Sequence, residues 1–226
     1  MRKTIMVCLS LALTALALMT GASPASADST FQPSFWNGRS VYLSVACHDG
    51  NDGVPGGPCI ANIGCSSYNE NTGSYNLASR AAIGTGTGMN LVERGYKARI
   101  GDGTLSANLG NSNAWGADLH MPLHSNAAGS GPCSGGTASV RGTWGLYEDA
   151  GDANCANHIV QKVGGLSPGY NDKPVASGGL GELRANAPSC YFESEFHTWA
   201  SGRNFLVDHL SWSYKVGATA DAYFGR

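Results

Sequence analysis

The chain has 226 residues, a length that favours a single domain. Charged residues make up only 13 % of the sequence, about half the globular average, and the 32 glycines predict many turns and long loops. The formal net charge of −2 argues against nucleic-acid binding and against electrostatic docking on an anionic membrane.

The N-terminal residues have the pattern of a secretory signal peptide. Two basic residues precede an apolar run from Ile5 to Met19, and Ala25 to Ala27 has the small-x-small form of a cleavage site. The apolar run is short for a membrane span, so we expect no stable membrane insertion. We expect residues 1–27 to be removed and residues 28–226 to form one secreted, extracellular domain.

Hydrophobic patterning predicts strands and helices that alternate along the rest of the chain. In chain order we expect a strand at 40–47, a loop at 49–68, a helix at 70–94, a strand at 96–100, a helix capped by Thr104 that ends near Trp115, a strand at 118–123, a loop at 127–136, a strand at 137–147, a helix at 152–163, a strand at 189–196 and a helix at 204–216. Such alternation is typical of an α/β fold, and the family resemblance described below implies one of the phosphorylase/hydrolase-like kind. Its central sheet is mixed and largely parallel, with helices on both faces.

The cysteines outside the signal peptide support export. They are even in number, which predicts disulfides in an exported protein. The sequence contains no C-x-x-C pair, which argues against a metal site made of cysteine thiolates. Their spacing allows many pairings; Cys59–Cys65 and Cys133–Cys155 are two that would close short loops. The disulfide candidates are Cys47, Cys59, Cys65, Cys133, Cys155 and Cys190.

Two histidines and a glutamate form a candidate metal site. His48 and His124 each directly follow a predicted strand, where functional groups collect in open α/β sheets, and Glu70 begins the long predicted helix. Two imidazoles and a carboxylate are the ligand set of a catalytic zinc site with one position open for water. Taken singly, each residue also has a commoner explanation, as a hydrogen-bonded surface histidine or as a glutamate favoured by the helix dipole.

Several segments together carry a family resemblance. The most specific is Gly116 to Ala127 (GADLHMPLHSNA), which is similar to a family segment ADL…S-I-H-x-N-A whose histidine binds zinc. Shorter matches are Glu70 with Tyr75 to Ala78, Leu91 to Ile100, Gly145 to Tyr147, and Leu183-Arg184 followed by Pro188 to Phe196. From about Val41 to about Tyr214 the chain thus resembles the zinc-dependent N-acetylmuramoyl-L-alanine amidases with a type 3 catalytic domain.

The resemblance implies a secreted hydrolase whose partner is peptidoglycan and whose cofactor is Zn²⁺. Such an enzyme cleaves the amide bond between N-acetylmuramic acid and L-alanine of the stem peptide. The resemblance assigns His48, Glu70 and His124 as metal ligands and Glu193 as the general base that takes a proton from the attacking water. The sequence points to no protein partner.

Departures from the family pattern leave alternatives open. Glu195 stands where the family often has glycine, and residues two apart share a strand face, so either Glu193 or Glu195 could be the base. His120 stands where an apolar residue is usual and shares a face with His124, which makes His120 an alternative ligand.

The surroundings of the first histidine also differ from the family. The turn Cys47-His48-Asp49-Gly50 replaces a G-H-G-G turn, and Asp49 and Asn126 are candidates to orient the histidine ligands. Two other functions therefore remain in competition with the amidase. One is another zinc amide hydrolase or peptidase on the same scaffold, and the other is a secreted cell-wall-binding domain without catalysis.

Overall fold

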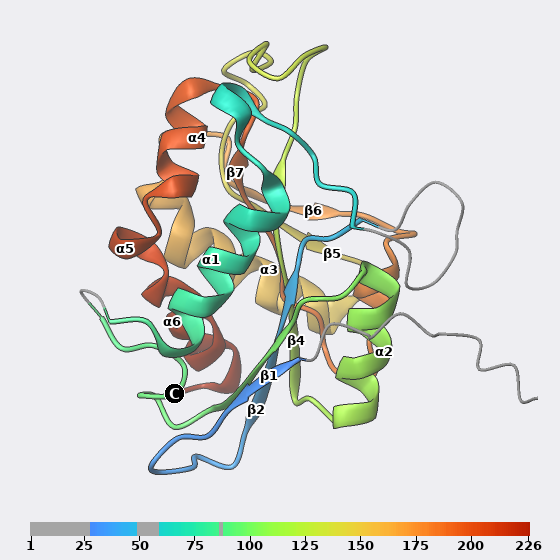
Figure 1. Cartoon of the computed structure of the whole chain (residues 1–226), viewed down its shortest axis with the longest axis vertical. Coiled ribbons are helices and arrows are strands. Elements are labelled where there is room, and N and C mark those ends of the chain that lie inside the picture. Colours follow the sequence, from blue (N-terminus) through green and yellow to red (C-terminus); the bar gives the residue numbers. More distant parts are fainter. Residues whose placement is uncertain (1–27, 49–58, 86–87) are drawn as a thin grey trace, which may run out of the picture.

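A seven-stranded sheet forms the centre of the protein, in the order β1-β3-β2-β4-β7-β5-β6 (Figure 1). The computed structural model describes residues 28–48, 59–85 and 88–226. The strands are β1 (Ser29–Phe31), β2 (Ser40–Val45), β3 (Lys97–Gly101), β4 (Leu119–Asn126), β5 (Trp144–Tyr147), β6 (Lys173–Ala176) and β7 (Tyr191–Phe196). Strand β2 is parallel to β3 and β4, β4 to β7, and β5 to β6, whereas β1–β3 and β5–β7 are antiparallel. The predicted mixed, largely parallel sheet is confirmed.

Helices cover both faces of this sheet, as predicted. They are α1 (Glu70–Ile83), α2 (Leu105–Trp115), α3 (Ala150–Val163), α4 (Ala200–Val207), α5 (His209–Trp212) and α6 (Tyr214–Phe224), with short 3₁₀ turns η1 (Cys65–Ser67), η2 (Gly164–Leu166) and η3 (Gly181–Arg184). Helices α1, α3 and α6 pack on one face, where their apolar side chains join those of the strands in one core. Helix α2 and turn η3 pack against each other, and α2 contacts β2 on the opposite face. Figure 1 shows α1 and α2 on opposite sides of β2 and β4.

The two faces of the central strands differ in polarity. The alternating residues Val41, Leu43 and Val45 of β2, and Leu119, Met121 and Leu123 of β4, all lie in the apolar core. Between them, Ser44 accepts a hydrogen bond from Asn108 of α2, and His120 contacts Ser112 of the same helix. The apolar core thus lies on one face of these strands, and buried polar side chains lie on the other face, under α2.

Three predicted elements differ from the structure. The helix expected to reach Arg94 ends at Ile83. Gly84 is its C-cap, and the Gly84 N–H donates a hydrogen bond to the Arg80 carbonyl. The strand expected from residue 137 begins only at Trp144, and residues 138–140 form a turn instead. The closing helix is broken into α4, α5 and α6. Strands β1 and β6 at the two sheet edges were not predicted.

Six cysteines form three disulfides, Cys47–Cys59, Cys65–Cys133 and Cys155–Cys190. The pairings Cys59–Cys65 and Cys133–Cys155 are therefore wrong. Cys155 of α3, for example, is buried against Cys190, which directly precedes β7. Disulfides of this kind are typical of proteins outside the reducing cytosol.

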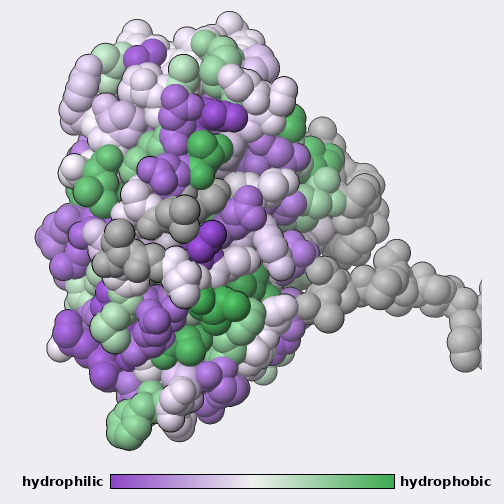
Figure 2. All heavy atoms as spheres, turned by 60° about the vertical axis from the view of Figure 1, so that its left-hand side comes forward, coloured by the Kyte–Doolittle hydropathy of each residue, from purple (hydrophilic) through white to green (hydrophobic). Residues whose placement is uncertain are grey.

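The outer surface near α1 and the C-terminal helices is mixed in character. Figure 2 shows hydrophobic side chains there in patches separated by hydrophilic ones. Among the described residues, no helix combines the length and the apolar character needed to cross a bilayer.

Candidate metal centre

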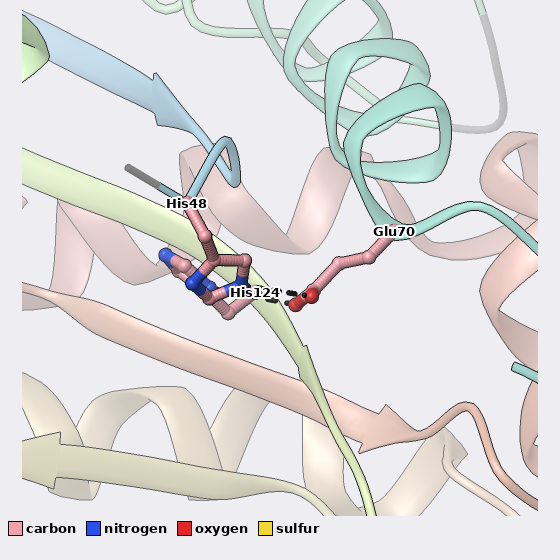
Figure 3. Close-up of side chains that lie close together, drawn as sticks. All are labelled: His48, Glu70 and His124. Carbon is pink, nitrogen blue, oxygen red and sulfur yellow. Dashed lines mark hydrogen bonds and ion pairs between the residues drawn. The ribbon is translucent and has the colours of Figure 1, made fainter. Parts of the chain in front are cut away.

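The three predicted ligands meet at the carboxyl ends of β2 and β4. His48 lies just beyond β2, His124 lies in β4, and Glu70 is the first residue of α1, whose N-terminus points at this edge (Figure 3). Asn69 caps that helix, because its side chain accepts a hydrogen bond of 3.0 Å from the Thr72 N–H. Parallel neighbouring strands bring their ends to one edge, which is why residues far apart in the sequence converge.

The carboxylate of Glu70 lies between the two imidazoles. Its Oε2 is 3.1 Å from His48 Nε2, and its Oε1 is 3.4 Å from His124 Nδ1. One ligand atom from each of the three residues lies within 4.8 Å of the others. Glu70 and His124 are buried, whereas the His48 side chain is 34 % exposed, so the cluster opens to solvent on the His48 side.

Burial and charge pairing determine the protonation of this cluster. Burial alone would raise the pKa of Glu70, but hydrogen bonds with His124 and His48 outweigh it and hold that pKa well below its ordinary value. Burial would lower the pKa of His124, but contacts with Glu182 and Glu70 raise it to about 10. The buried site therefore favours positive charge next to Glu70, which a divalent cation would also provide.

The donor set fits Zn²⁺. Two imidazole nitrogens and one carboxylate, supplied by three different elements, match the ligands of catalytic zinc sites. Further groups hold the carboxylate in place: the Ser125 N–H donates to Glu70 Oε1 at 2.9 Å, and Asn62 Nδ2 donates to Glu70 Oε2 at 2.8 Å. Such outer contacts orient metal ligands.

Glu182 is a buried carboxylate that sequence reasoning missed. It lies in η3, and its Oε2 is 3.1 Å from His124 Nε2, on the other side of the ring from Glu70. Burial would raise the pKa of Glu182, but contacts with His120 and His124 outweigh it and lower the pKa to about 2. The only signal in the sequence is its position just before the matched pair Leu183-Arg184.

His120 lies beside this network rather than in the cluster of ligands. Its Nδ1 is 3.0 Å from Ser112 Oγ, its Nε2 is 3.4 Å from Glu182 Oε1, and its ring stacks on Tyr42. It shares the α2 side of β4 with His124, as its spacing predicts. Within the described residues, the group able to hold a metal contains His124 and not His120.

Glu193 lies directly opposite His124 where β4 pairs with β7. Residues paired in this way lie side by side on one face of a sheet. The Oε2 atom of Glu193 has no hydrogen-bond partner among the described residues, although the side chain is only partly exposed. Burial raises the pKa of this carboxyl to about 8, opposed by the charge of His124 and reinforced by Glu70.

Glu195 has a different environment from Glu193. Both of its oxygens are occupied: Oε1 accepts from the N–H groups of Gly142 and Phe196, and Oε2 accepts from Ser167 Oγ and the Gly169 N–H. The side chain is fully buried. Glu195 thus ties two loops to the end of β7.

These contacts predict a structural effect for Glu195. We expect Glu195→Ala to lower the free energy of unfolding by about 3 kcal/mol, because buried donors lose their acceptor at about 1 to 3 kcal/mol each. Urea unfolding followed by tryptophan fluorescence measures the change. Glu148→Ala is the control, since the exposed pair of Glu148 with Arg184 is worth less than about 1 kcal/mol. Equal losses in the two variants would contradict this role.

The remaining candidates divide between described and undescribed residues. The Asn126 side chain accepts a hydrogen bond from the Ala127 N–H at 2.8 Å, within its own turn. Asp49 lies outside the described residues. The groups that contact the predicted ligands include Asn62, the Ser125 N–H and Glu182. Asn62 lies eight residues from its partner Glu70, whereas the Ser125 N–H and Glu182 lie 55 and 58 residues from theirs.

Comparison with known proteins shows a similar architecture in solved structures. Neither family models nor curated proteins match the sequence. The N-acetylmuramoyl-L-alanine amidase AmiC2 of Nostoc punctiforme has a TM-score of 0.61 at 16 % identity, over 83 % of this chain and 98 % of that one. The catalytic domain of the CD27L endolysin targeting Clostridia difficile gives 0.61 at 18 % identity, over 83 % and 98 %.

A third similar structure is the catalytic domain of CwlV, an N-acetylmuramoyl-L-alanine amidase from Bacillus (Paenibacillus) polymyxa. Its TM-score is 0.59 at 13 % identity, over 82 % of this chain and 96 % of that one. Almost the whole length of each of these domains is therefore matched, although few residues are identical. The chain has the fold of N-acetylmuramoyl-L-alanine amidase catalytic domains.

Proposed function

We propose that this protein is a secreted, zinc-dependent N-acetylmuramoyl-L-alanine amidase. The observation that carries the proposal is the largely buried cluster of His48, Glu70 and His124, with Glu193 and its unpaired Oε2 atom on the neighbouring strand. The amidase fold of the structural neighbours supports the reaction class. The family segment around His124 supports the same assignment from the sequence.

His48, Glu70 and His124 would hold the ion, with His48 at the solvent side of the site. When bound there, Zn²⁺ supplies Lewis-acid chemistry that polarises a carbonyl group and makes water more acidic. Glu70 and His124 stay buried behind the site, so the scissile amide has to approach from the exposed edge of His48. That amide joins the lactyl carbonyl of N-acetylmuramic acid to the nitrogen of L-alanine.

Glu193 is the proposed general base. Its unpaired Oε2 accepts a proton from the attacking water, and the same carboxyl then delivers that proton to the leaving nitrogen of L-alanine. A group that takes and returns a proton works best with a pKa near the working pH, and burial brings the pKa of Glu193 to about 8. Glu195 is not assigned this role, because both of its carboxylate oxygens already accept hydrogen bonds from the protein.

A small pocket adjoins the proposed site on the α2 side. It has a volume of about 190 Å³ and is lined mainly by apolar residues such as Leu105, Leu109 and Leu180, with Tyr191 and Glu182 at its wall. Tyr191 also stacks on the His124 ring at 4.8 Å between centroids. The pocket therefore offers an apolar surface next to the proposed metal ligands.

The cellular setting of the proposal rests on the chain's own features. Residues 1–27, the expected signal peptide, lie outside the described part of the chain. The three disulfides favour an oxidising location, which is where peptidoglycan is found. We propose that the protein acts on peptidoglycan and does not bind nucleic acid.

The test is metal content and product analysis on the oxidised mature chain. We expect about one zinc per chain, a loss of zinc in His124→Ala, and release of L-alanine amino termini from peptidoglycan. His158→Ala is the matched control, because His158 lies in α3, outside the cluster. Other amino termini would identify a peptidase, and wall binding without zinc or cleavage would identify a binding domain.

A further inference from the structure

We propose that Glu182 is a positioning residue that orients His124 for the metal. The inference rests on the proposed zinc site and adds a residue that the family resemblance does not assign. In this role Glu182 holds the Nε2–H of His124, so that Nδ1 is left for the ion beside Glu70.

The geometry separates the two nitrogens of His124. Nε2 lies 3.1 Å from Glu182 Oε2, whereas Nδ1 lies 3.4 Å from Glu70 Oε1. One carboxylate therefore faces each ring nitrogen, Glu182 at Nε2 and Glu70 at Nδ1. Stacking of the ring on Tyr191, with planes 19° apart, restrains rotation about the remaining axis.

Glu182 is itself fixed by groups from three elements. Ser44 Oγ of β2 donates a hydrogen bond to Oε1, and Asn108 of α2 donates to that hydroxyl at 3.0 Å. His120 of β4 approaches the same oxygen at 3.4 Å and is anchored on Ser112. A buried carboxylate with this many polar partners is costly to desolvate, and replacing such groups with apolar ones is often neutral or stabilising. The network is thus better explained by the position it gives to His124 than by its contribution to stability.

Carboxylate partners of this kind change how strongly a histidine binds a metal. They fix the tautomer and the ring orientation and raise the basicity of the ligating nitrogen, and their loss typically costs about 10- to 100-fold in metal affinity. The effect passes through His124, since Glu182 faces the nitrogen that does not point at the cluster.

The experiment is a zinc titration in competition with a chromophoric chelator. We expect Glu182→Gln to weaken zinc binding by about 10- to 100-fold, because the neutral amide supports the imidazole less. Glu182→Asp keeps the charge on a shorter arm and should give a smaller loss. Glu195→Gln is the matched control: it alters an equally buried carboxylate outside the cluster and should lower the free energy of unfolding without changing zinc affinity.

A second readout separates positioning from folding. Cobalt-loaded protein should show a changed visible spectrum in Glu182→Gln and an unchanged spectrum in Glu195→Gln, because only the first substitution alters the surroundings of a proposed metal ligand.

If Glu182→Gln does not fold, Ser44→Ala serves as a second variant. It removes one hydrogen bond to the Glu182 carboxylate and should still weaken zinc binding. Wild-type affinity in a folded Glu182 variant, or in Ser44→Ala, would overturn the role of Glu182 alone. Failure of the wild type to bind zinc would overturn the proposed site and this inference together.

Discussion

Glu193→Gln is expected to retain zinc and to lower amide hydrolysis by about 10²- to 10⁴-fold. Glutamine has nearly the same shape as glutamate, so the three metal ligands keep their places, but it cannot accept the proton from water. The loss should appear in kcat rather than KM, because Glu193 acts on the proton and not on the polymer. Release of L-alanine amino termini from peptidoglycan, with zinc content measured on the same sample, tests this prediction.

Glu195→Gln provides the comparison for that experiment. It makes the same chemical change two residues away, in a side chain bound to Gly142, Ser167 and Gly169. We expect Glu195→Gln to lose stability and to keep its kcat. An active Glu193→Gln, or an inactive but stable Glu195→Gln, would exchange the roles of the two glutamates.

Glu193→Gln should also stabilise the metal-free protein at alkaline pH. Burial raises the pKa of Glu193 from 4.5 to about 8, so the folded chain keeps a proton that the unfolded chain has released. The stability linked to this proton is fully present below about pH 4.5 and is lost as the pH rises through about 8. At pH 8, with chelator present, we expect Glu193→Gln to be more stable than the wild type by about 2 kcal/mol. One pKa unit corresponds to about 1.4 kcal/mol, and the partial exposure of the side chain to solvent reduces the free energy that the whole pKa shift would otherwise give. At pH 4 the two should unfold alike.

Local patterning was enough to predict the central strands but not the edges. Alternation in β2 and the apolar residues of β7 mark them as strands, because their faces are buried. Strand β1 has three residues and β6 contains Pro174, so neither has a pattern of its own; pairing with β3 and β5 supplies their order. The false strand before Trp144 contains Gly142 at φ +148°, and its Arg141 side chain donates to the Gly135 carbonyl, which favours turns.

The candidate site could be predicted only where the chain carries its own signal. His48 directly follows β2 and Glu70 opens α1, as predicted, whereas His124 lies within β4 near its end rather than after it. Sheet topology brings these three positions to one edge. Glu182 has no such signal, because its partners Ser44 and His124 lie on strands far away in the sequence. The disulfide pairings could not be predicted for the same reason: Cys65 in η1 and Cys133, for example, are 68 residues apart in the sequence and meet only in the folded chain.

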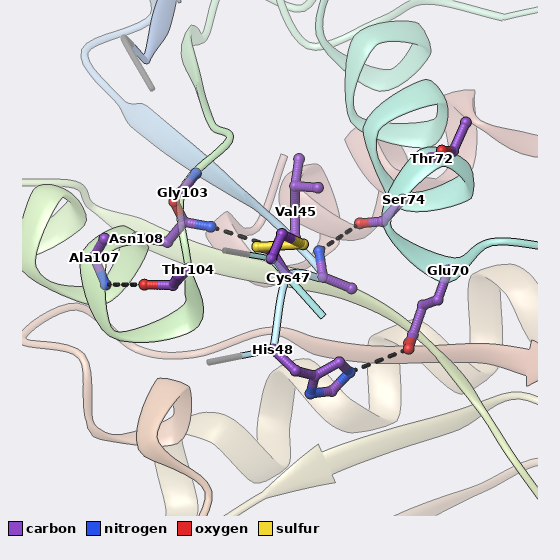
Figure 4. The surroundings of a disulfide bond; sticks show 12 residues. Val45, Cys47, His48, Glu70, Thr72, Ser74, Gly103, Thr104, Ala107 and Asn108 are labelled. Carbon is purple, nitrogen blue, oxygen red and sulfur yellow. Dashed lines mark hydrogen bonds and ion pairs between the residues drawn. A yellow bond between two sulfur atoms is a disulfide. The ribbon is translucent and has the colours of Figure 1, made fainter. Parts of the chain in front are cut away.

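Loss of the Cys47–Cys59 disulfide should weaken zinc binding through His48. Cys47 directly precedes the proposed ligand His48 (Figure 4). The backbone of His48 pairs with Ile60, the neighbour of Cys59, through hydrogen bonds of 3.2 and 3.1 Å. The segment then leads to Asn62, which contacts both His48 and Glu70. One covalent bond thus holds a proposed metal ligand and the side chain that contacts two of the proposed ligands.

The size of this effect follows from the loop that the bond closes. Closing a loop of roughly this length costs about 3 kcal/mol, which zinc binding itself would have to supply in the open chain. Because 1.4 kcal/mol is a factor of ten, Cys47→Ala/Cys59→Ala should bind zinc about 100-fold more weakly. The matched control is Cys155→Ala/Cys190→Ala, whose bond joins α3 to the start of β7 in the apolar core. That control should lower the free energy of unfolding by about 2 to 5 kcal/mol and leave zinc affinity unchanged. Equal zinc affinity in both double variants would mean that the backbone pairing at Ile60, and not the disulfide, holds His48 in place.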